Sequence, residues 1–161
     1  SWNRLQSSTS LMQQELAEPP SVSGWPAYYQ IPQFHELWIN SDTISNRNKV
    51  SDTLATNGYR IGTTRLKIDP LHFTKKSSTA SDPNLLIHDF LEIMHTLDVD
   101  QSQREHMKSI LLSGQLNDDY WTQAWDAYIN DPDNTTKANI VSTRLSALFK
   151  YLMNLSEFQL S

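Results

Sequence analysis

The chain has 161 residues, 38% of them hydrophobic and 10% aromatic, which is enough for one domain with a buried core. Its formal net charge of −5 and its 13 scattered Lys and Arg residues argue against nucleic acid as a partner. The absence of cysteine excludes disulfides, thiol catalysis and Cys-ligated zinc, and no apolar run approaches the ~20 residues of a membrane span.

The first residue is Ser rather than Met, and no charged-then-apolar signal segment follows it. We therefore expect a processed protein or a fragment of a longer one. A helix is predicted over residues 9–17, ending before Pro19-Pro20, with the first few residues frayed or packed elsewhere. Residues 18–32 hold four prolines and predict an irregular loop. This proline-rich loop carries three rings that must be buried or presented to a partner, namely Trp25, Tyr28 and Tyr29.

Two short helices are expected next, over residues 33–41 and 43–56, and Gly58 is a stop signal for the second. Residues 59–68 alternate apolar and polar side chains around a Gly-Thr-Thr turn, which predicts a β-hairpin. Because a single hairpin is marginally stable, it must lie against the helices. Residues 77–81 predict a linker.

The C-terminal half predicts four helices, over residues 83–97, 101–113, 118–130 and 135–159. Their starts carry capping signals, such as Asp82-Pro83 before the first of them. Three of the helices have an apolar stripe at helical spacing. The stripes consist of Leu86, Phe90, Ile93, Met94 and Leu97; of Trp121, Ala124, Trp125 and Tyr128; and of Val141, Leu145, Leu148, Leu152 and Leu155.

Together these elements predict a mainly α fold, a helical bundle of five to seven helices with a proline-rich N-terminal loop and one small β-hairpin. We expect one domain over residues 1–161. Within it, residues 1–58 form the loop and short helices, 59–68 the hairpin and 82–160 the helical bundle.

The most metal-like set is His88, Glu92 and His95, whose spacings of four and three place them on one helical face. Glu-x-x-His occurs in di-metal helical bundles, but those sites need a second such motif, which this sequence lacks. The face also lies opposite Leu86 and Phe90, where water is expected. We therefore predict a solvated polar face, with no metal and no cofactor.

The aromatic side chains of Tyr120, Trp121, Trp125 and Tyr128 suggest sugar stacking, because flat rings can cover sugar faces. Trp121, Ala124, Trp125 and Tyr128 nevertheless have the i, i+3, i+4, i+7 spacing of an ordinary buried stripe, which we favour. The stripe over residues 141–155 spans barely two heptads, so it predicts a core helix rather than a coiled coil.

A second polar set belongs to the region that follows the proline-rich loop and consists of His35, Glu36, Asp42, Arg47 and Asp52. These side chains either build a pocket or form a hydrogen-bond network that satisfies the loop backbone, and we favour the network. The candidate ligand-binding residues are His35, Asp42 and Arg47 of this set, together with Trp25, Tyr28 and Tyr29. The sequence has no Gly-x-Ser-x-Gly, no phosphate-binding Gly-rich loop and no His-Glu-x-x-His, so no catalytic residue is assigned.

One stretch is distinctive as a signature: Pro-Pro-Ser-Val-Ser-Gly-Trp-Pro-Ala-Tyr-Tyr-Gln at 19–30, followed by Leu-Trp-Ile-Asn-Ser at 37–41. It resembles the C-terminal part of domain-of-unknown-function family 1800, which consists of large, mostly bacterial proteins with members from Bacteroides-type bacteria. Downstream segments resemble the same family, at 68–70, 82–84, 110–115 and 151–153. The resemblance implies a C-terminal piece of a longer protein, and it implies no chemistry because the family has no established activity.

Members of that family often look exported and often neighbour an uncharacterised sulfatase-like family. By association, this implies work in the periplasm or cell envelope, with a glycan, an envelope protein or the rest of the longer chain as partner. The first hypothesis is a non-catalytic structural or interaction module of a larger exported bacterial protein. The alternatives are part of a hydrolase-like, glycan-related enzyme completed by an N-terminal region, and a carbohydrate-binding module that uses Trp25, Tyr28 and Tyr29.

Overall fold

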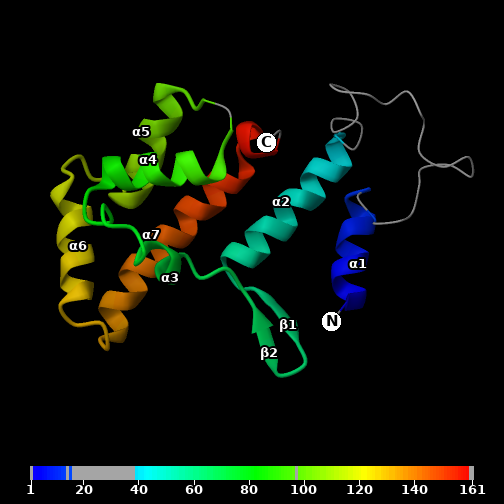
Figure 1. Cartoon of the computed structure of the whole chain (residues 1–161), viewed down its shortest axis with the longest axis horizontal. Coiled ribbons are helices and arrows are strands. Elements are labelled where there is room, and N and C mark those ends of the chain that lie inside the picture. The colour runs from blue at the N-terminus through cyan, green and yellow to red at the C-terminus, as the bar shows by residue number, and fades with distance from the viewer. Residues whose placement is uncertain (1, 14, 16–38, 97, 160–161) are drawn as a thin grey trace, which may run out of the picture.

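The structure is a computed structural model of the whole chain, and it describes residues 2–13, 15, 39–96 and 98–159. Within these residues it has eight helices and one two-stranded antiparallel sheet (Figure 1). In chain order they are α1 (Trp2–Leu11), α2 (Ser41–Ala55), β1 (Tyr59–Ile61), β2 (Thr64–Leu66), α3 (Pro70–Thr74), α4 (Pro83–Met94), α5 (Gln101–Leu111), α6 (Asp119–Ile129), α7 (Thr135–Asn154) and α8 (Ser156–Gln159). The predicted mainly α fold with one small hairpin is confirmed. The loop predicted over 18–32 and most of the helix predicted over 33–41 lie outside the described residues.

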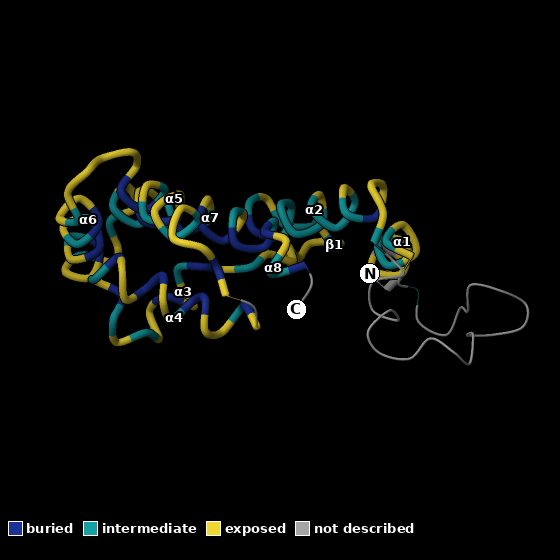
Figure 2. Tube along the Cα trace, turned by 90° about the horizontal axis from the view of Figure 1, so that it is seen from above, coloured by how far each residue is buried: buried dark blue, intermediate teal, exposed yellow. Residues whose placement is uncertain are grey.

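The long helix α7 is the centre of the fold. It runs through the middle of the molecule, and α2, α3, α5 and α6 pack against it (Figure 1). Seen from above, α3 and α4 lie in a layer below α7, and α1 is at the end of the molecule far from α6 (Figure 2). The stripe predicted for α7 is confirmed, because its five side chains are all buried: Val141, Leu145, Leu148, Leu152 and Leu155.

Aromatic side chains join the layers of the C-terminal half. The rings of Phe73, Phe90 and Phe149 come from α3, α4 and α7, and their centroids lie 5.1–5.9 Å apart. On α6, Trp121 is fully buried and stacks on Trp125. Its indole N–H donates to the backbone oxygen of Ala80 over 2.8 Å, so the buried polar atom is satisfied. Trp125 and Tyr128 are buried as well, so the predicted stripe on α6 is confirmed for its three rings, whereas Tyr120 is 50% exposed.

Helix starts follow the local capping signals. The Asp82 carboxylate accepts from the backbone N–H groups of Asn84 and Leu85 at the start of α4. Asp100 and Gln103 form a reciprocal capping box at the start of α5. These bonds satisfy N–H groups that have no partner inside a helix.

The first helix differs from the prediction. It spans Trp2–Leu11 rather than residues 9–17, and its serine-rich part does not interrupt it. The hydroxyls of Ser7 and Thr9 donate to the backbone oxygens of Asn3 and Gln6 inside the same helix. These residues therefore find their hydrogen bonds within the helical conformation, and the expectation of frayed first residues is wrong for residues 2–11.

The C-terminal ends of α7 and α4 also differ from the prediction. The helix predicted over 135–159 is divided at Leu155, whose backbone is extended (φ −65°, ψ 144°) while its side chain stays buried. Helix α4 ends at Met94, and its buried face is formed by Leu86, Ile87, Phe90 and Leu91, whereas Ile93 is 66% exposed. The prediction was therefore correct for Leu86 and Phe90 and wrong for Ile93, and the buried face includes Ile87 and Leu91 instead.

No described helix combines the length and the apolar composition that crossing a bilayer requires.

Candidate functional site

Most of the residues predicted as ligand-binding lie outside the described residues, namely Trp25, Tyr28, Tyr29 and His35. Asp42 is exposed in the first turn of α2. Arg47 lies five residues later and is half-buried, which lowers the pKa of its guanidinium. Five residues on a helix turn a side chain by about 140°, so Asp42 and Arg47 point to different sides of α2. The predicted set stays a prediction.

The histidine set on α4 is divided between solvent and interior. His88 and Glu92 are exposed, with His88 Nε2 3.4 Å from Glu92 Oε1, as a solvated face requires. His95 follows the end of the helix and turns inward, where it is 9% exposed and neither ring nitrogen has a hydrogen-bond partner. Burial lowers its pKa, and the charge of Glu157 opposes that shift. Within the described residues, no three His, Asp or Glu side chains could hold a metal ion together.

A mixed polar and apolar cleft lies between α3, the turn after it and α4. We call it the Asp89 cleft. Its volume is about 340 Å³, and it is lined by Phe73, Lys76, Ser77, Ser78, Asp89, Phe90, Glu92 and Ile93. This volume is at the lower end of the ~300–1,000 Å³ typical of ligand pockets, so the cleft suits one side chain or a small head group.

The Asp89 carboxylate is fixed by hydroxyl groups from the turn. Its Oδ2 accepts from Ser77 Oγ over 2.9 Å and from Thr79 Oγ1, and the Ser77 hydroxyl also accepts from the Thr79 backbone N–H. These bonds, with that of Thr79 first, hold the pKa of Asp89 below its ordinary value. No described residue donates to the other oxygen, Oδ1.

The remaining lining combines a second carboxylate with apolar walls. Asp89, Glu92 and Ile93 are at positions i, i+3 and i+4 of α4 and so share one face. Ile93 is 66% exposed, and the partly exposed ring of Phe73 lies on the α3 side. Lys76 is exposed and makes no ion pair with a carboxylate of the described residues.

An ionised carboxylate that already accepts two hydroxyl hydrogen bonds is suited to binding a donor rather than to giving up a proton. The arrangement at Asp89 can therefore accept a hydrogen bond from a donor placed in the cleft.

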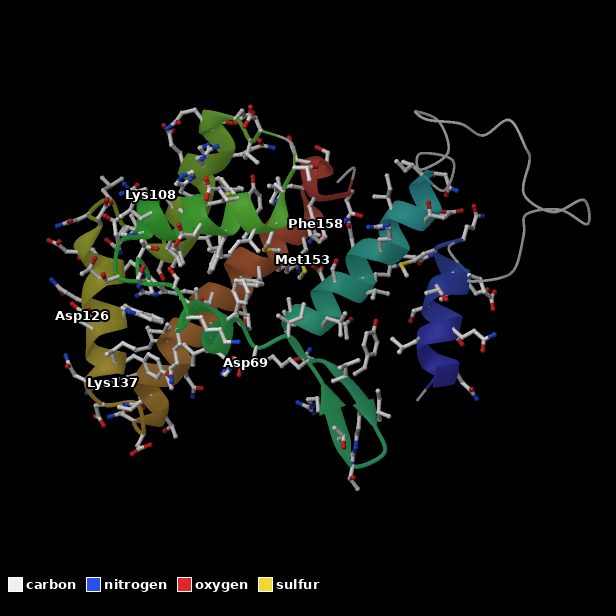
Figure 3. All side chains as sticks on the ribbon, in the orientation of Figure 1. Asp69, Lys108, Asp126, Lys137, Met153 and Phe158 are labelled. Carbon is white, nitrogen blue, oxygen red and sulfur yellow. The ribbon has the colours of Figure 1, made fainter. Side chains whose placement is uncertain are left out.

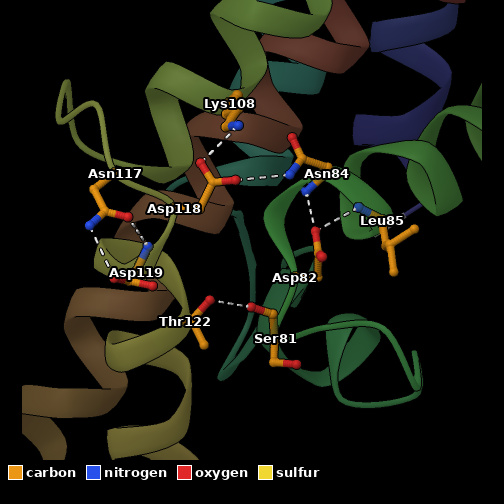
Figure 4. Close-up of polar contacts among 9 residues, drawn as sticks. All are labelled: Ser81, Asp82, Asn84, Leu85, Lys108, Asn117, Asp118, Asp119 and Thr122. Carbon is orange, nitrogen blue, oxygen red and sulfur yellow. Dashed lines mark hydrogen bonds and ion pairs between the residues drawn. The ribbon is translucent and has the colours of Figure 1, made fainter.

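Other carboxylates are used to hold helices together. Asp118 accepts from Lys108 over 2.8 Å and from Asn84 over 2.9 Å, which ties α6 to α5 and α4 (Figure 4). The Lys108 hydrogen bond is the main reason why the pKa of Asp118 is lowered. Thr122 on α6 also donates to the backbone oxygen of Ser81 (Figure 4).

Polar side chains join α2 to α7 and α8 in the same way. Asp52 on α2 lies 3.0 Å from Lys150 Nζ and accepts from Asn154 over 2.8 Å. One turn earlier on α2, Asn48 accepts from Gln159 of α8. Asp52 therefore belongs to a structural contact.

A second, apolar cavity of about 90 Å³ lies between α1, α2 and the hairpin. Its lining is Leu5, Ser8, Thr9, Met12, Val50, Leu54, Tyr59, Ile61 and Leu66. It is smaller than an ordinary ligand pocket. We describe it as a packing gap of the N-terminal helices.

No pattern in the sequence predicted the Asp89 cleft. Residues 77–81 were predicted to be a linker, and their Ser-x-Thr pattern ten to twelve residues before Asp89 is the signal that was available. That signal becomes a site only when α3 and α4 come together, where the ring centroids of Phe73 and Phe90 are 5.8 Å apart. Figure 3 draws the described side chains on the ribbon.

The described residues thus form a mainly α-helical fold with a cleft of about 340 Å³ between α3 and α4. Residues 1–160 match the model of a family described as "Protein of unknown function (DUF1800)", so the chain belongs to that family, as the resemblance of its proline-rich signature predicted. A comparison with curated proteins found no match, and neither did a comparison with solved structures.

Proposed function

We propose that this chain is a non-catalytic interaction module that binds a partner protein through the Asp89 cleft. The observation that carries the proposal is the state of the carboxylates. Asp89 and Asp118 are both held ionised by the protein's own donors. Hydroxyl hydrogen bonds to Asp89 and the ion pair of Lys108 with Asp118 fit carboxylates that fix structure or accept hydrogen bonds from a ligand.

The apolar part of the cleft supports the same function. Ile93 exposes 66% of its surface beside the ionised Asp89, and Phe73 exposes 36%. Exposed apolar side chains rimmed by polar groups are typical of protein interaction sites. A partner segment that covered Ile93 would bury apolar area worth about 25 cal/mol per Å².

Two other hypotheses are a hydrolase-like enzyme completed by another region and a carbohydrate-binding module. The enzyme would use His35, Asp42 and Arg47, of which His35 lies outside the described residues, and the module would use Trp25, Tyr28 and Tyr29, which all lie outside them. They stay predictions. The same holds for a longer parent protein exported to the periplasm or envelope.

The function is tested by selecting peptides from a random library displayed on phage against the immobilised chain. Two variants serve for counter-selection, Ile93→Glu in the cleft and Ile140→Glu on α7, where Ile140 is also partly exposed at 44%. We expect enriched peptides that bind the unchanged chain and the Ile140→Glu variant but lose binding to Ile93→Glu. If no sequence is enriched, or if both variants bind equally well, the proposed function is wrong.

A further inference from the structure

The Asp89 cleft has a chemical preference that the proposed function leaves open. Asp89 Oδ1 is without a donor among the described residues, while Oδ2 is fixed by Ser77 and Thr79. A carboxylate held in this way has one oxygen directed by the protein and one available to a ligand. A ligand that binds this oxygen must therefore be a hydrogen-bond donor.

Charge narrows the class of donor. Asp89 and Glu92 place two carboxylates on the wall formed by α4, against one cation, Lys76, so the cleft has a net negative charge. The whole chain has a formal net charge of −5, which favours approach by a basic partner. A cationic donor is thus preferred over a neutral one.

The apolar walls favour one kind of cationic donor, a guanidinium group, over an ammonium group. The ring of Phe73 is partly exposed at one side of the cleft, and Ile93 is exposed at the other. A guanidinium group is planar, stacks on aromatic rings and is weakly hydrated, whereas an ammonium group is compact and strongly hydrated. An arginine side chain also brings an apolar stem that can lie along the Ile93 side chain.

We propose that the Asp89 cleft binds the arginine side chain of a partner segment, with the guanidinium group donating to Asp89 Oδ1 and lying against Phe73. This proposal rests on the proposed function and names the chemistry of its partner. Glu92 adds charge at the edge of the cleft. Lys76 opposes the ligand, so its removal strengthens binding.

The test uses ¹⁵N-labelled chain and two matched probes, N-acetyl-arginine amide and N-acetyl-citrulline amide. Citrulline has nearly the shape of arginine but carries a neutral urea group. We expect arginine amide to shift the amide resonances of residues 76–79 and 89–93 in a saturable way, and citrulline amide to shift them at least about tenfold more weakly. Equal effects of the two probes, or shifts confined to other residues, would overturn the proposal.

Three variants connect the binding to the cleft. Asp89→Asn, which keeps an oxygen for the Ser77 and Thr79 hydroxyls, is expected to weaken arginine binding at least about tenfold. Lys76→Ala is expected to strengthen it, and Glu105→Gln, an exposed position on α5, to leave it unchanged. If Asp89→Asn fails to fold, Glu92→Gln at an exposed position takes its place, with a smaller loss expected. Unchanged binding in the cleft variants contradicts the proposal.

A neutral sugar, methyl α-glucoside, is titrated as a further probe. Cleft shifts with the sugar and none with arginine amide would contradict the arginine proposal and favour a carbohydrate ligand.

The phage selection distinguishes a failure of the arginine proposal from a failure of the proposed function. Enriched peptides that depend on Ile93 but lack arginine would keep the interaction module and refute the arginine preference, while a selection without any enriched peptide refutes the module itself.

Discussion

The N-terminal region, formed by α1, α2 and the hairpin, differs from the C-terminal region, formed by α3 to α8, in what holds its elements in place. Among the described residues, twenty apolar side chains form the buried core, and Ala55 is the one that the N-terminal region supplies. In Figure 2, buried segments follow α4, α6 and α7, whereas α1 is mostly exposed. Burial of apolar surface therefore contributes more to the stability of the C-terminal region than to that of the N-terminal region.

The two regions are joined mainly along α2. Asn40 and Thr43 form the capping box that starts this helix, and Ala55 at its end reaches the core. Between them, Asp52 bonds to Lys150 and Asn154 of α7. The N-terminal region thus depends on the C-terminal region for its position. Four pairs of substitutions test this comparison of the two regions, and they follow from the largest expected effect to the smallest.

The largest effect is expected from Trp121→Ala in the C-terminal region. Trp121 is fully buried and donates to Ala80, so its loss should lower the free energy of unfolding by about 3–5 kcal/mol. The matched change in the N-terminal region is Leu5→Ala, where a leucine 45% exposed should cost less than about 1 kcal/mol. Urea unfolding followed by circular dichroism measures both. Similar losses for the two variants would contradict the division into regions.

Asp52→Ala tests the contact between the regions. The change leaves the Asn154 amide without its acceptor and removes the ion pair with Lys150, so a loss of about 1–3 kcal/mol is expected. Asp126→Ala, at an exposed position on α6, is the control and should stay within about 0.5 kcal/mol. Hydrogen exchange of α2 should accelerate in Asp52→Ala alone. If α2 keeps its protection, Asp52 does not hold the regions together.

Gly58→Ala tests the hairpin within the N-terminal region. Gly58 has a φ of +69°, and an added Cβ would lie 2.5 Å from the Leu66 backbone oxygen. Gly62 has a similar φ of +61° but open space around it, so Gly62→Ala separates backbone strain from steric clash. We expect Gly58→Ala to remove hairpin amide protection more strongly than Gly62→Ala. The urea midpoint should change little in both variants, because the hairpin adds no residue to the core; a large shift of that midpoint in Gly58→Ala would count against this.

The smallest effect is a pH dependence from His95 in the C-terminal region. Burial lowers the pKa of His95 below its ordinary value of 6.5, so the unfolded chain binds more protons once the pH falls towards and below that value. The free energy of unfolding is therefore expected to decrease between pH 7.5 and pH 5. His95→Phe should make that decrease smaller, while His88→Phe, at an exposed position, should not. The same slope in all three proteins would show that His95 does not contribute.

Much of the C-terminal region was predictable from the sequence because its determinants are local. The stripe that contains Leu145 and Leu148 repeats at helical spacing, and Asp100 and Gln103 carry a capping box in four residues. Such signals need no knowledge of the tertiary structure. They predicted the buried faces of α6 and α7 correctly.

The Asp89 cleft and the inward turn of His95 were not predictable in this way. The cleft depends on the approach of Ser77 and Thr79 to Asp89 after the chain reverses between α3 and α4. His95 turns inward because α4 ends at Met94. The prediction that placed His95 on the same helical face as Glu92 assumed a helix that continues past residue 95. Both features are set by where elements end and meet, which periodicity does not record.

The account is tested most directly by native-state hydrogen exchange on the whole chain. Amides in the middle of α4, α6 and α7 should exchange only through global unfolding, with the free energy that urea unfolding gives. Amides of α1 and the hairpin should exchange through openings of lower free energy, with α2 between the two. Equal protection of α1, the hairpin and α7 would contradict the account, because it would mean that both regions unfold as one cooperative unit.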